Sequence, residues 1–349
     1  MSQHLPLQSS GREPRLPDRS PKVATTRWYR RLVRDETGVT VVLVVLVLGV
    51  GLLHPTFLDV DNLLSTGRSA VFVGLMAGGM VFALAMREVD LSVGGNFALT
   101  IVAGAIFMRE GVPPWLAVPL MLVLATLLGV VNGAITTYAR IPSFIVTLAT
   151  ALLYRGIALA LSDSNQIFEL PQDSSYFTWF GGRTFGVPTS IGVLLVSVAV
   201  LTVLFTRTRF GAQVRAVGSN PDAATFTGLP VNRIRIQALG LSGLMAGVAG
   251  TTALAFFISG DPTLGSGFEL TAIAAAIIGG TPLAGGRGSV PGALVGALIL
   301  AVVTSALVFF RIPINWTSFA TGGVILFAVA ADAGLRRYRA NQQLRGPHT

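Results

Sequence analysis

Long apolar segments alternate with short polar connections along most of the chain. Many of these segments approach about twenty residues, the length that an α-helix needs to cross the hydrocarbon core of a bilayer. Backbone polar groups in lipid must be satisfied within the protein, so long uninterrupted runs favour helices over a barrel. The pattern predicts an all-α polytopic membrane protein. About ten transmembrane helices are expected, at residues 39–54, 69–86, 92–108, 115–137, 143–162, 187–206, 236–258, 270–284, 291–310 and 316–332.

Two basic tails flank the apolar part of the chain. Residues 1–36 are rich in Pro, Ser, Arg and Gln and are expected to form a disordered tail, because they lack the cleavage pattern of a signal peptide. Residues 336–349 form a second basic tail behind a transmembrane domain at 37–335. With the N-terminus inside, 20 of the 25 Lys and Arg residues fall in cytoplasmic segments. Because basic residues concentrate in cytoplasmic loops, both termini are predicted to be cytoplasmic.

The composition excludes several kinds of chemistry. The chain has no Cys and three His, and a mean hydropathy of +0.69 excludes a soluble globular protein. No nucleophile-base pair or metal-binding cluster is therefore expected, and neither catalytic nor cofactor-binding residues are predicted. Lys22 is the only lysine, so a phosphate-binding loop ending in Gly-Lys-Ser/Thr is impossible. If ATP is used, a partner subunit binds it. The basic residues are expected to orient the chain in the membrane rather than to bind nucleic acid.

A short helix signal lies in the polar connection at 207–235. Asn220 is a good N-cap residue, and Pro221 suits the first helical position. Gly228 can end the helix in a left-handed conformation. Two interpretations are open: an ordinary loop helix, or a rigid element that contacts a partner. In the second, Phe226 is the anchor, although its ring can also pack back onto the membrane domain. The residues assigned to this element are Asn220, Pro221, Asp222, Ala223, Ala224, Phe226 and Gly228.

Three further stretches interrupt the apolar pattern. Residues 87–96 combine charges with glycines, which is consistent with a re-entrant segment or with a tight turn in which the charges pair locally and Ser92 caps the next helix. Residues 279–292 hold six glycines, and close helix packing is favoured there over nucleotide binding. Within residues 132–148, the hydroxyls of Ser143 and Thr147 share one helix face. Two interpretations are open: the hydroxyls line a polar path, or they donate hydrogen bonds to the backbone of their own helix. The candidate pathway residues are Asn96, Ser143, Phe144 and Thr147.

The predicted outer loop at 163–186 is polar and contains a group of four aromatic residues at 176–180. Aromatic side chains are enriched at membrane–water interfaces, so this group is expected to form an anchoring belt. A docking role for a partner is the other interpretation. The four residues are Tyr176, Phe177, Trp179 and Phe180.

Four motifs occur in one order with family-like spacing: Arg-Glu-Val-Asp-Leu-Ser-Val-Gly at 87–94, Gly-Ser-Asn-Pro-Asp-Ala-Ala-Thr-Phe-Thr-Gly at 218–228, Ser-Gly-Leu-Met-Ala-Gly-Val-Ala-Gly at 242–250, and Ile-Gly-Gly-Thr-Pro-Leu-Ala-Gly-Gly-Arg-Gly-Ser-Val at 278–290. Together they make the chain resemble the permease subunits of the ribose/xylose/arabinose group of bacterial ABC sugar importers, over about residues 40 to 335. The chain departs from the family pattern at Thr271, where many relatives have an acidic residue, and at Pro282, where Ser is usual. These departures leave the sugar subtype open.

The resemblance implies a multi-pass protein of the bacterial inner membrane that translocates a pentose, a hexose or a related polyol. It implies a second copy of the chain, two ATP-binding subunits or one fused double ATPase, and an extracytoplasmic sugar-binding protein. The stretch at 220–228 matches the family's coupling helix, which contacts the ATPase.

An ion-coupled secondary transporter of a small polar solute is the alternative function. Such proteins carry ionisable residues inside their spans. Here Arg155 lies within a predicted span, and Glu110, Glu269 and Asp332 lie near span ends. This scarcity argues against ion coupling.

Overall fold

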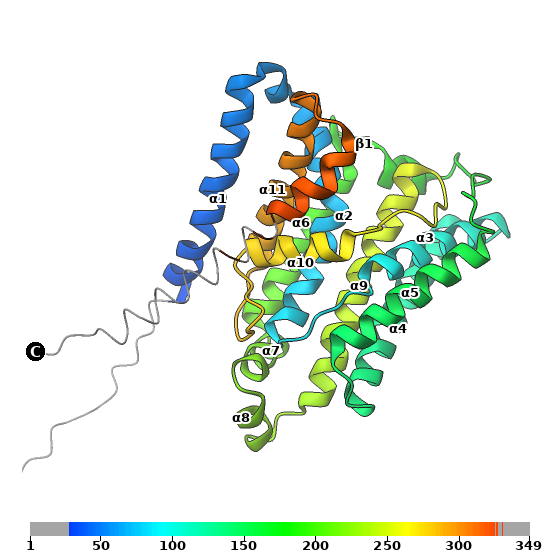
Figure 1. The fold of residues 1–349 in the computed structure, drawn as a ribbon. Coiled ribbons are helices and arrows are strands. Elements are labelled where there is room, and N and C mark those ends of the chain that lie inside the picture. Colours follow the sequence, from blue (N-terminus) through cyan, green and yellow to red (C-terminus); the bar gives the residue numbers. More distant parts are fainter. Residues whose placement is uncertain (1–27, 325, 327–329, 331–349) are drawn as a thin grey trace, which may run out of the picture.

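The computed structural model describes residues 28–324, 326 and 330, which form a bundle of helices with one small hairpin (Figure 1). The helices are α1 Trp28–Leu53, α2 Val60–Ala85, α3 Val93–Arg109, α4 Pro114–Tyr138, α5 Ser143–Leu161, α6 Thr189–Arg207, α7 Arg209–Ser219, α8 Pro221–Phe226, α9 Val231–Phe257, α10 Phe268–Ile278 and α11 Val290–Phe309. Three single-turn helices are η1 Pro55–Leu58, η2 Phe177–Gly181 and η3 Ile314–Trp316. Strands β1 Arg183–Thr184 and β2 Val187–Pro188 pair antiparallel. Residues 317–324 are also helical.

Helices α2 and α9 form the centre of the molecule. In their most apolar windows 89% and 78% of the residues are buried, whereas α4, α5 and α6 bury fewer than a third. Helix α9 packs against α2, α3 and α4, and α2 also packs against α6 and α11. The close α4–α9 contact needs small residues, because a Cβ at Gly129 would lie 2.4 Å from the Leu239 carbonyl oxygen. The exposed sides of the outer helices are apolar, as expected for contact with lipid.

The prediction of ten spans is only partly matched. Among the described residues, six helices are long and apolar enough to cross a membrane: α2, α4, α5, α6, α9 and α11. Residues 37–53, α3 and α10 are shorter apolar helices. The predicted span at 270–284 is wrong in its extent, because α10 ends at Ile278 and has 11 residues. At 1.5 Å per residue it is about 16 Å long, roughly half of a hydrocarbon core.

The ends of the chain differ from the expected boundaries or fall outside the description. Helix α1 begins at Trp28, so residues 28–36 of the predicted tail are helical. Residues 1–27, the basic tail at 336–349 and most of the second half of the predicted tenth span lie outside the described residues.

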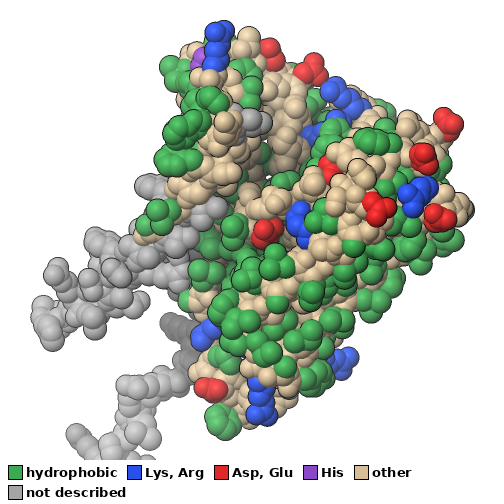
Figure 2. All heavy atoms as spheres, turned by 45° about the vertical axis from the view of Figure 1, so that its right-hand side comes forward, with side chains coloured by type: hydrophobic (Ala, Val, Ile, Leu, Met, Phe, Trp, Pro, Cys, Tyr) green, Lys and Arg blue, Asp and Glu red, His purple; other side chains and the backbone are tan. Residues whose placement is uncertain are grey.

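The connections lie at two opposite ends of the bundle (Figure 1). One end, called the α8 end below, contains the connections at 139–142, 208–230 and 279–289. The other, called the distal end, contains 54–59, 110–113 and 162–188, where Trp115 Nε1 donates to Ser175 Oγ over 2.8 Å. On the face shown in Figure 2, hydrophobic side chains cover a broad band and most acidic side chains lie toward the distal end.

Two of the four aromatic residues at 176–180, in the 162–188 connection, are buried rather than placed at a surface. Tyr176 is fully buried and its hydroxyl donates to the Thr251 carbonyl over 2.5 Å, and Phe177 is buried beside it. Trp179 is exposed. Only part of the group is therefore available for the expected interfacial belt, because tertiary packing takes up the rest.

Candidate functional site

Helix α8 begins as its sequence predicts. The Asn220 side-chain oxygen accepts a hydrogen bond from the Ala223 backbone N–H at 3.0 Å. Pro221 occupies the first helical position and Asp222 lies in the first turn, near the positive end of the helix dipole. The cap satisfies one of the free N–H groups of a very short helix, so this boundary is strongly specified.

The other end of α8 is closed by backbone geometry. Gly228 has a φ of +80°, and its N–H donates to the Thr225 carbonyl at 3.0 Å. The Leu229 N–H donates to the Ala224 carbonyl, also at 3.0 Å. This pair of bonds is a Schellman motif, in which a left-handed residue lets the chain satisfy the last carbonyls. Glycine adopts that φ without the steric cost that a Cβ brings.

One face of α8 packs inward and the other is free. Ala224 is buried, whereas Phe226 is 91% exposed. The Phe226 side chain therefore does not fold back onto the membrane domain. Figure 1 shows α8 projecting at the end of the bundle. A large apolar side chain is thus exposed on a short helix with both ends closed.

Helix α7 joins α8 to the bundle at a tight junction. Arg87 donates from Nε to the Gly218 carbonyl at 2.7 Å and from Nη2 to the Ser219 carbonyl at 2.8 Å. The Gly286 N–H donates to the Ala85 carbonyl at 2.8 Å. A Cβ at Gly218 would lie 1.6 Å from the Ala85 oxygen, so no larger residue fits there. The ends of α2 and α7 and the connection at 279–289 thus meet at one point.

A second contact fixes the corner between α6 and α7. The Thr208 hydroxyl caps α7 by accepting from the Gly211 N–H at 3.2 Å. Arg215 donates to the Phe205 carbonyl and lies over the Phe205 ring, with 5.1 Å between its guanidinium carbon and the ring centroid. Burial lowers the pKa of the Arg215 guanidinium from its ordinary value. Arginine tolerates this because its ordinary pKa is far above neutral.

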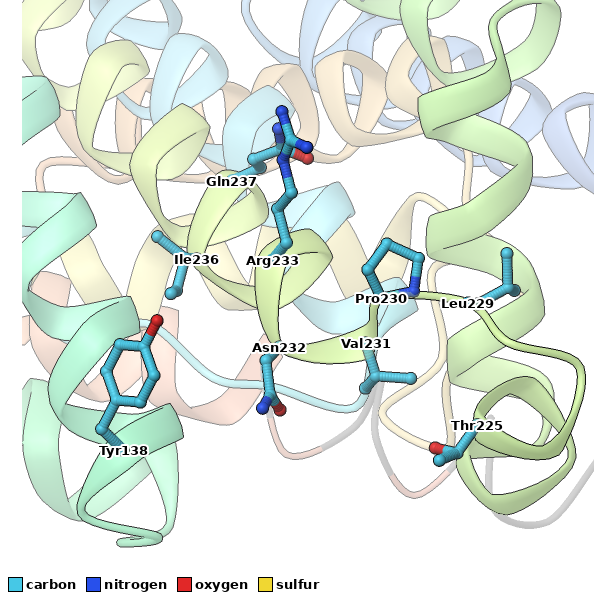
Figure 3. A pocket seen from close by; sticks show the side chains of 9 residues that line it. All are labelled: Tyr138, Thr225, Leu229, Pro230, Val231, Asn232, Arg233, Ile236 and Gln237. Carbon is cyan, nitrogen blue, oxygen red and sulfur yellow. The ribbon is translucent and has the colours of Figure 1, made fainter.

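An open groove runs beside α8 (Figure 3). It lies between the C-terminal end of α4 and the first turns of α9, so α8 forms only one edge of it. Its lining combines apolar with polar side chains: Tyr138, Thr225, Leu229, Pro230, Val231, Asn232, Arg233, Ile236 and Gln237.

The segment 86–92 links the α7 junction to the interior. Helix α2 ends at Ala85 and α3 starts at Val93, and Glu88 pairs with Arg235 of α9 at 2.6 Å. Arg87 and Glu88 are thus matched by distant elements, whereas the Asp90 carboxylate bonds locally to Ser92. Ser92 makes no capping hydrogen bond to α3, which corrects the expectation that it caps this helix.

A buried polar network holds the same segment from within. The Ser92 hydroxyl donates to Asp90 Oδ1 at 2.6 Å and accepts from Asn132 Nδ2 at 2.7 Å. Asn132 Oδ1 accepts from the Tyr154 hydroxyl at 2.9 Å. Asp90 and Asn132 have no exposed surface. The network joins the 86–92 segment to α4 and α5. Sequence reasoning missed Tyr154, whose only signal is a polar group inside an apolar run.

The four candidate pathway residues lie in different surroundings. The Ser143 hydroxyl accepts a hydrogen bond from the Val89 N–H at 3.1 Å, and the Thr147 hydroxyl accepts one from the Leu91 N–H at 3.0 Å. Both side chains therefore hold the 86–92 segment. Thr147 also donates to the Ser143 carbonyl of its own helix at 2.8 Å. Asn96 is fully buried and donates to the Ala125 carbonyl at 2.9 Å. Phe144 lies on the outer side of α5 and is half exposed.

Thr271, one of the two departures from the family pattern, lines a cavity of about 470 Å³ between α2, α10 and α11. Hydroxyl side chains are frequent in its wall: Ser69, Ser266, Thr271, Thr304, Thr317, Ser318 and Thr321. Such a lining offers both donors and acceptors.

Comparison with known proteins agrees with this architecture. Residues 62–329 match the family described as branched-chain amino acid transport system / permease component. The ribose import permease protein RbsC of Escherichia coli K12 is 34% identical over 312 residues, which are 89% of this chain and 97% of RbsC.

Two further relatives carry the names of other sugars. The D-allose transport system permease protein AlsC of Escherichia coli K12 is 33% identical over 300 residues, 85% of this chain and 91% of AlsC. The L-arabinose ABC transporter permease protein AraH of Azospirillum brasilense is 34% identical over 309 residues, 88% of this chain and 89% of AraH. Since the family match covers most of the bundle, the chain belongs to the family of transport-system permease components described for branched-chain amino acids, and it is a multi-pass membrane transport protein rather than an enzyme.

Proposed function

We propose that this chain is the membrane-spanning subunit of an ATP-binding-cassette importer that carries a pentose, a hexose or a related polyol. The observation that carries the proposal is α8, a helix with both ends closed and an exposed Phe226. The names of the relatives, which specify ribose, allose and arabinose, support a sugar as the cargo. The ion-coupled alternative is not favoured, because AraH is named an ABC transporter permease, RbsC an import permease and AlsC a transport-system permease.

Helix α8 acts as the coupling helix in this proposal. Phe226 inserts into a groove on an ATP-binding subunit, and ATP-driven movement of that subunit displaces α8. The displacement passes through Gly218 and Ser219 to Arg87, whose two hydrogen bonds tie α7 to the 86–92 segment. That segment is bonded to α5 and α9, so the movement reaches the helices of the core.

The proposed orientation places the α8 end and both chain termini in the cytoplasm. Among the described residues, eight arginines belong to the helix ends and connections at the α8 end, and Figure 2 shows most acidic side chains toward the distal end. The eight are Arg87, Arg140, Arg207, Arg209, Arg215, Arg233, Arg235 and Arg287. Basic residues concentrate on the cytoplasmic side. The distal end then faces the extracytoplasmic sugar-binding protein.

The proposed assembly contains a second copy of this chain and two ATP-binding subunits, or one fused double ATPase. ATP is bound by the partner, since this chain lacks a phosphate-binding loop. The Gly- and Ala-rich helices permit close packing between copies. In this proposal the transport path lies at or near their interface.

The proposal is tested by purifying the tagged chain from its native membranes in mild detergent. The expected complex contains two copies of the chain and an ATP-binding partner, and mass measurement gives the stoichiometry. Sugar uptake is expected to survive collapse of the ion gradient and to stop when ATP is depleted. Uptake that follows the ion gradient instead contradicts the proposal.

A further inference from the structure

Two oppositely charged side chains, Arg155 and Glu269, lie beside the same glycine in the apolar part of the molecule. Arg155 is six residues from the C-terminal end of α5, or roughly 9 Å along the helix axis. Charges at such a depth are costly and usually face protein or water, where they bind ligands or other charges. Neither residue contributes to α8 or to the junction beneath it.

Arg155 is held in place but is not saturated. Its Nη1 donates to the carbonyls of Pro262 and Thr263, both at 3.3 Å, and its Nη2 donates to the Gly94 carbonyl at 3.4 Å. All three bonds are long for N–H···O contacts. A guanidinium has five N–H groups, so two of them make no hydrogen bond to any described residue.

Glu269 has no partner among the described residues, with which it forms neither a hydrogen bond nor an ion pair. It lies in the first turn of α10 and is partly exposed. A Cβ built on Gly94 would lie 2.0 Å from Glu269 Oε2, so the carboxylate sits directly against the Gly94 backbone. Arg155 contacts the carbonyl of the same glycine but does not pair with Glu269. The two groups therefore present unused donors and acceptors near one point.

The location of this pair is toward the distal end. Asp261, one residue before the carbonyls bound by Arg155, accepts from Gln166 of the 162–188 connection at 2.7 Å. Ile167 forms a backbone bridge with Gly260. The pair thus lies beneath the distal connections.

We propose that Arg155 and Glu269 form a sugar-binding subsite in the distal half of the transport path, an inference that rests on the proposed function. A carboxylate accepts hydrogen bonds from two neighbouring hydroxyls, and the free guanidinium N–H groups donate to a hydroxyl or ring oxygen. Charge-assisted hydrogen bonds of this kind are stronger than neutral ones. The opposite charges give the subsite no net charge, which suits a neutral polyol.

A zwitterionic amino acid offers complementary charges to the same two groups. The family description names branched-chain amino acids, whereas the individual relatives carry the names of sugars at 33–34% identity. These relatives favour the sugar, and the amino acid becomes an outcome of the test.

The test uses the full chain alone, in membranes, and follows the rate of maleimide labelling at Ser266→Cys. The chain has no other cysteine, and Ser266 is an exposed residue three positions before Glu269.

D-ribose, D-allose and L-arabinose are the probes, and L-leucine is the comparison ligand. At least one sugar is expected to slow labelling, and L-leucine is not. Glu269→Gln in this background is expected to raise the sugar concentration for half protection about tenfold, the loss of one charge-assisted hydrogen bond. Arg155→Lys is expected to act in the same direction.

Glu110→Gln is the matched control, because Glu110 is an exposed carboxylate at the end of α3 that pairs with Arg109. It is expected to leave protection unchanged. The proposed subsite is contradicted if no sugar slows labelling or if L-leucine alone slows it. It is also contradicted if sugar protects the Glu269→Gln variant as well as it protects the parent. Since labelling needs no ATPase, these outcomes are independent of ATP-binding-subunit co-purification, which reports on the proposed function.

Discussion

Phe226 is the single side chain on which the coupling proposal depends most. It is 91% exposed at the end of α8, so its removal opens no cavity in this chain. Burying a phenylalanine side chain in a partner contributes about 1.5–3 kcal/mol through the apolar surface removed from water. Anchors of this kind often dominate the binding energy of an interface.

Phe226→Ala is therefore expected to leave membrane abundance and self-association normal, to weaken binding of the ATP-binding subunit at least tenfold, and to abolish sugar uptake. Abundance and co-purification of the ATPase are measured together. Phe185→Ala is the control, because Phe185 is equally exposed but lies in the β1–β2 turn at the distal end. Normal ATPase binding with reduced abundance would exclude the anchoring role.

Gly228 closes α8 through its positive φ rather than through lack of space. No atom lies within 4 Å of a Cβ built on Gly228, and the same is true of Gly192 in α6, where φ is not positive. Gly228→Ala is expected to cost the local helix about 1–2 kcal/mol, since an L-residue is strained there. Gly192→Ala is expected to be neutral or slightly stabilising. Hydrogen exchange over residues 220–229 measures the difference, and equal protection in both variants would rule out the strain argument.

At the scale of elements, Arg87 joins α7 to the segment between α2 and α3. Arg87→Ala removes the two side-chain hydrogen bonds to the Gly218 and Ser219 carbonyls. The variant is expected to bind the ATPase through an intact α8 but to hydrolyse ATP without transport. Parallel assays of ATP hydrolysis and sugar uptake measure this. Arg287→Ala, which removes an exposed arginine from the neighbouring connection, is the control. Fully coupled transport in Arg87→Ala would contradict the proposed route.

Thr147 of α5 distinguishes a structural from a transport role for the candidate pathway residues. Its hydroxyl bonds the backbone at Leu91 and Val89. Thr147→Val leaves the Leu91 N–H without this acceptor, which is expected to cost about 1–3 kcal/mol and to lower abundance without changing the preference among sugars. Thr126→Val is the control, because Thr126 bonds only within its own helix. Normal abundance with an altered sugar preference would instead place Thr147 on the path.

For the whole molecule, the two ends of the bundle are predicted to face opposite sides of the membrane. Ser175 is exposed at the distal end and Ser219 is exposed at the α8 end. Ser175→Cys is expected to react with an impermeant maleimide in intact cells, and Ser219→Cys only after permeabilisation. The absence of cysteine from the chain removes any background. The reverse pattern would invert the proposed orientation.

The sequence by itself determined the features that depend on neighbouring residues. The apolar runs located the main helices, because a span needs only length and hydrophobicity. Asn220, Pro221 and Gly228 specified both ends of α8, because capping bonds reach only a few residues along the chain. The four motifs identified the family, which the comparison bears out.

Tertiary structure decided what depends on residues far apart in the chain. Glu88 pairs with Arg235 across 147 positions, and Val89 bonds Ser143 across 54. No local pattern contains these partners, so Glu88 does not pair locally and Ser92 does not cap α3, although turns form at 86–87 and 91–92. The short α10 and the approach of Arg155 and Glu269 to Gly94 have the same origin. The sequence pattern shows whether a segment is apolar. The packing of the helices decides where each helix ends and which polar groups from distant segments come together.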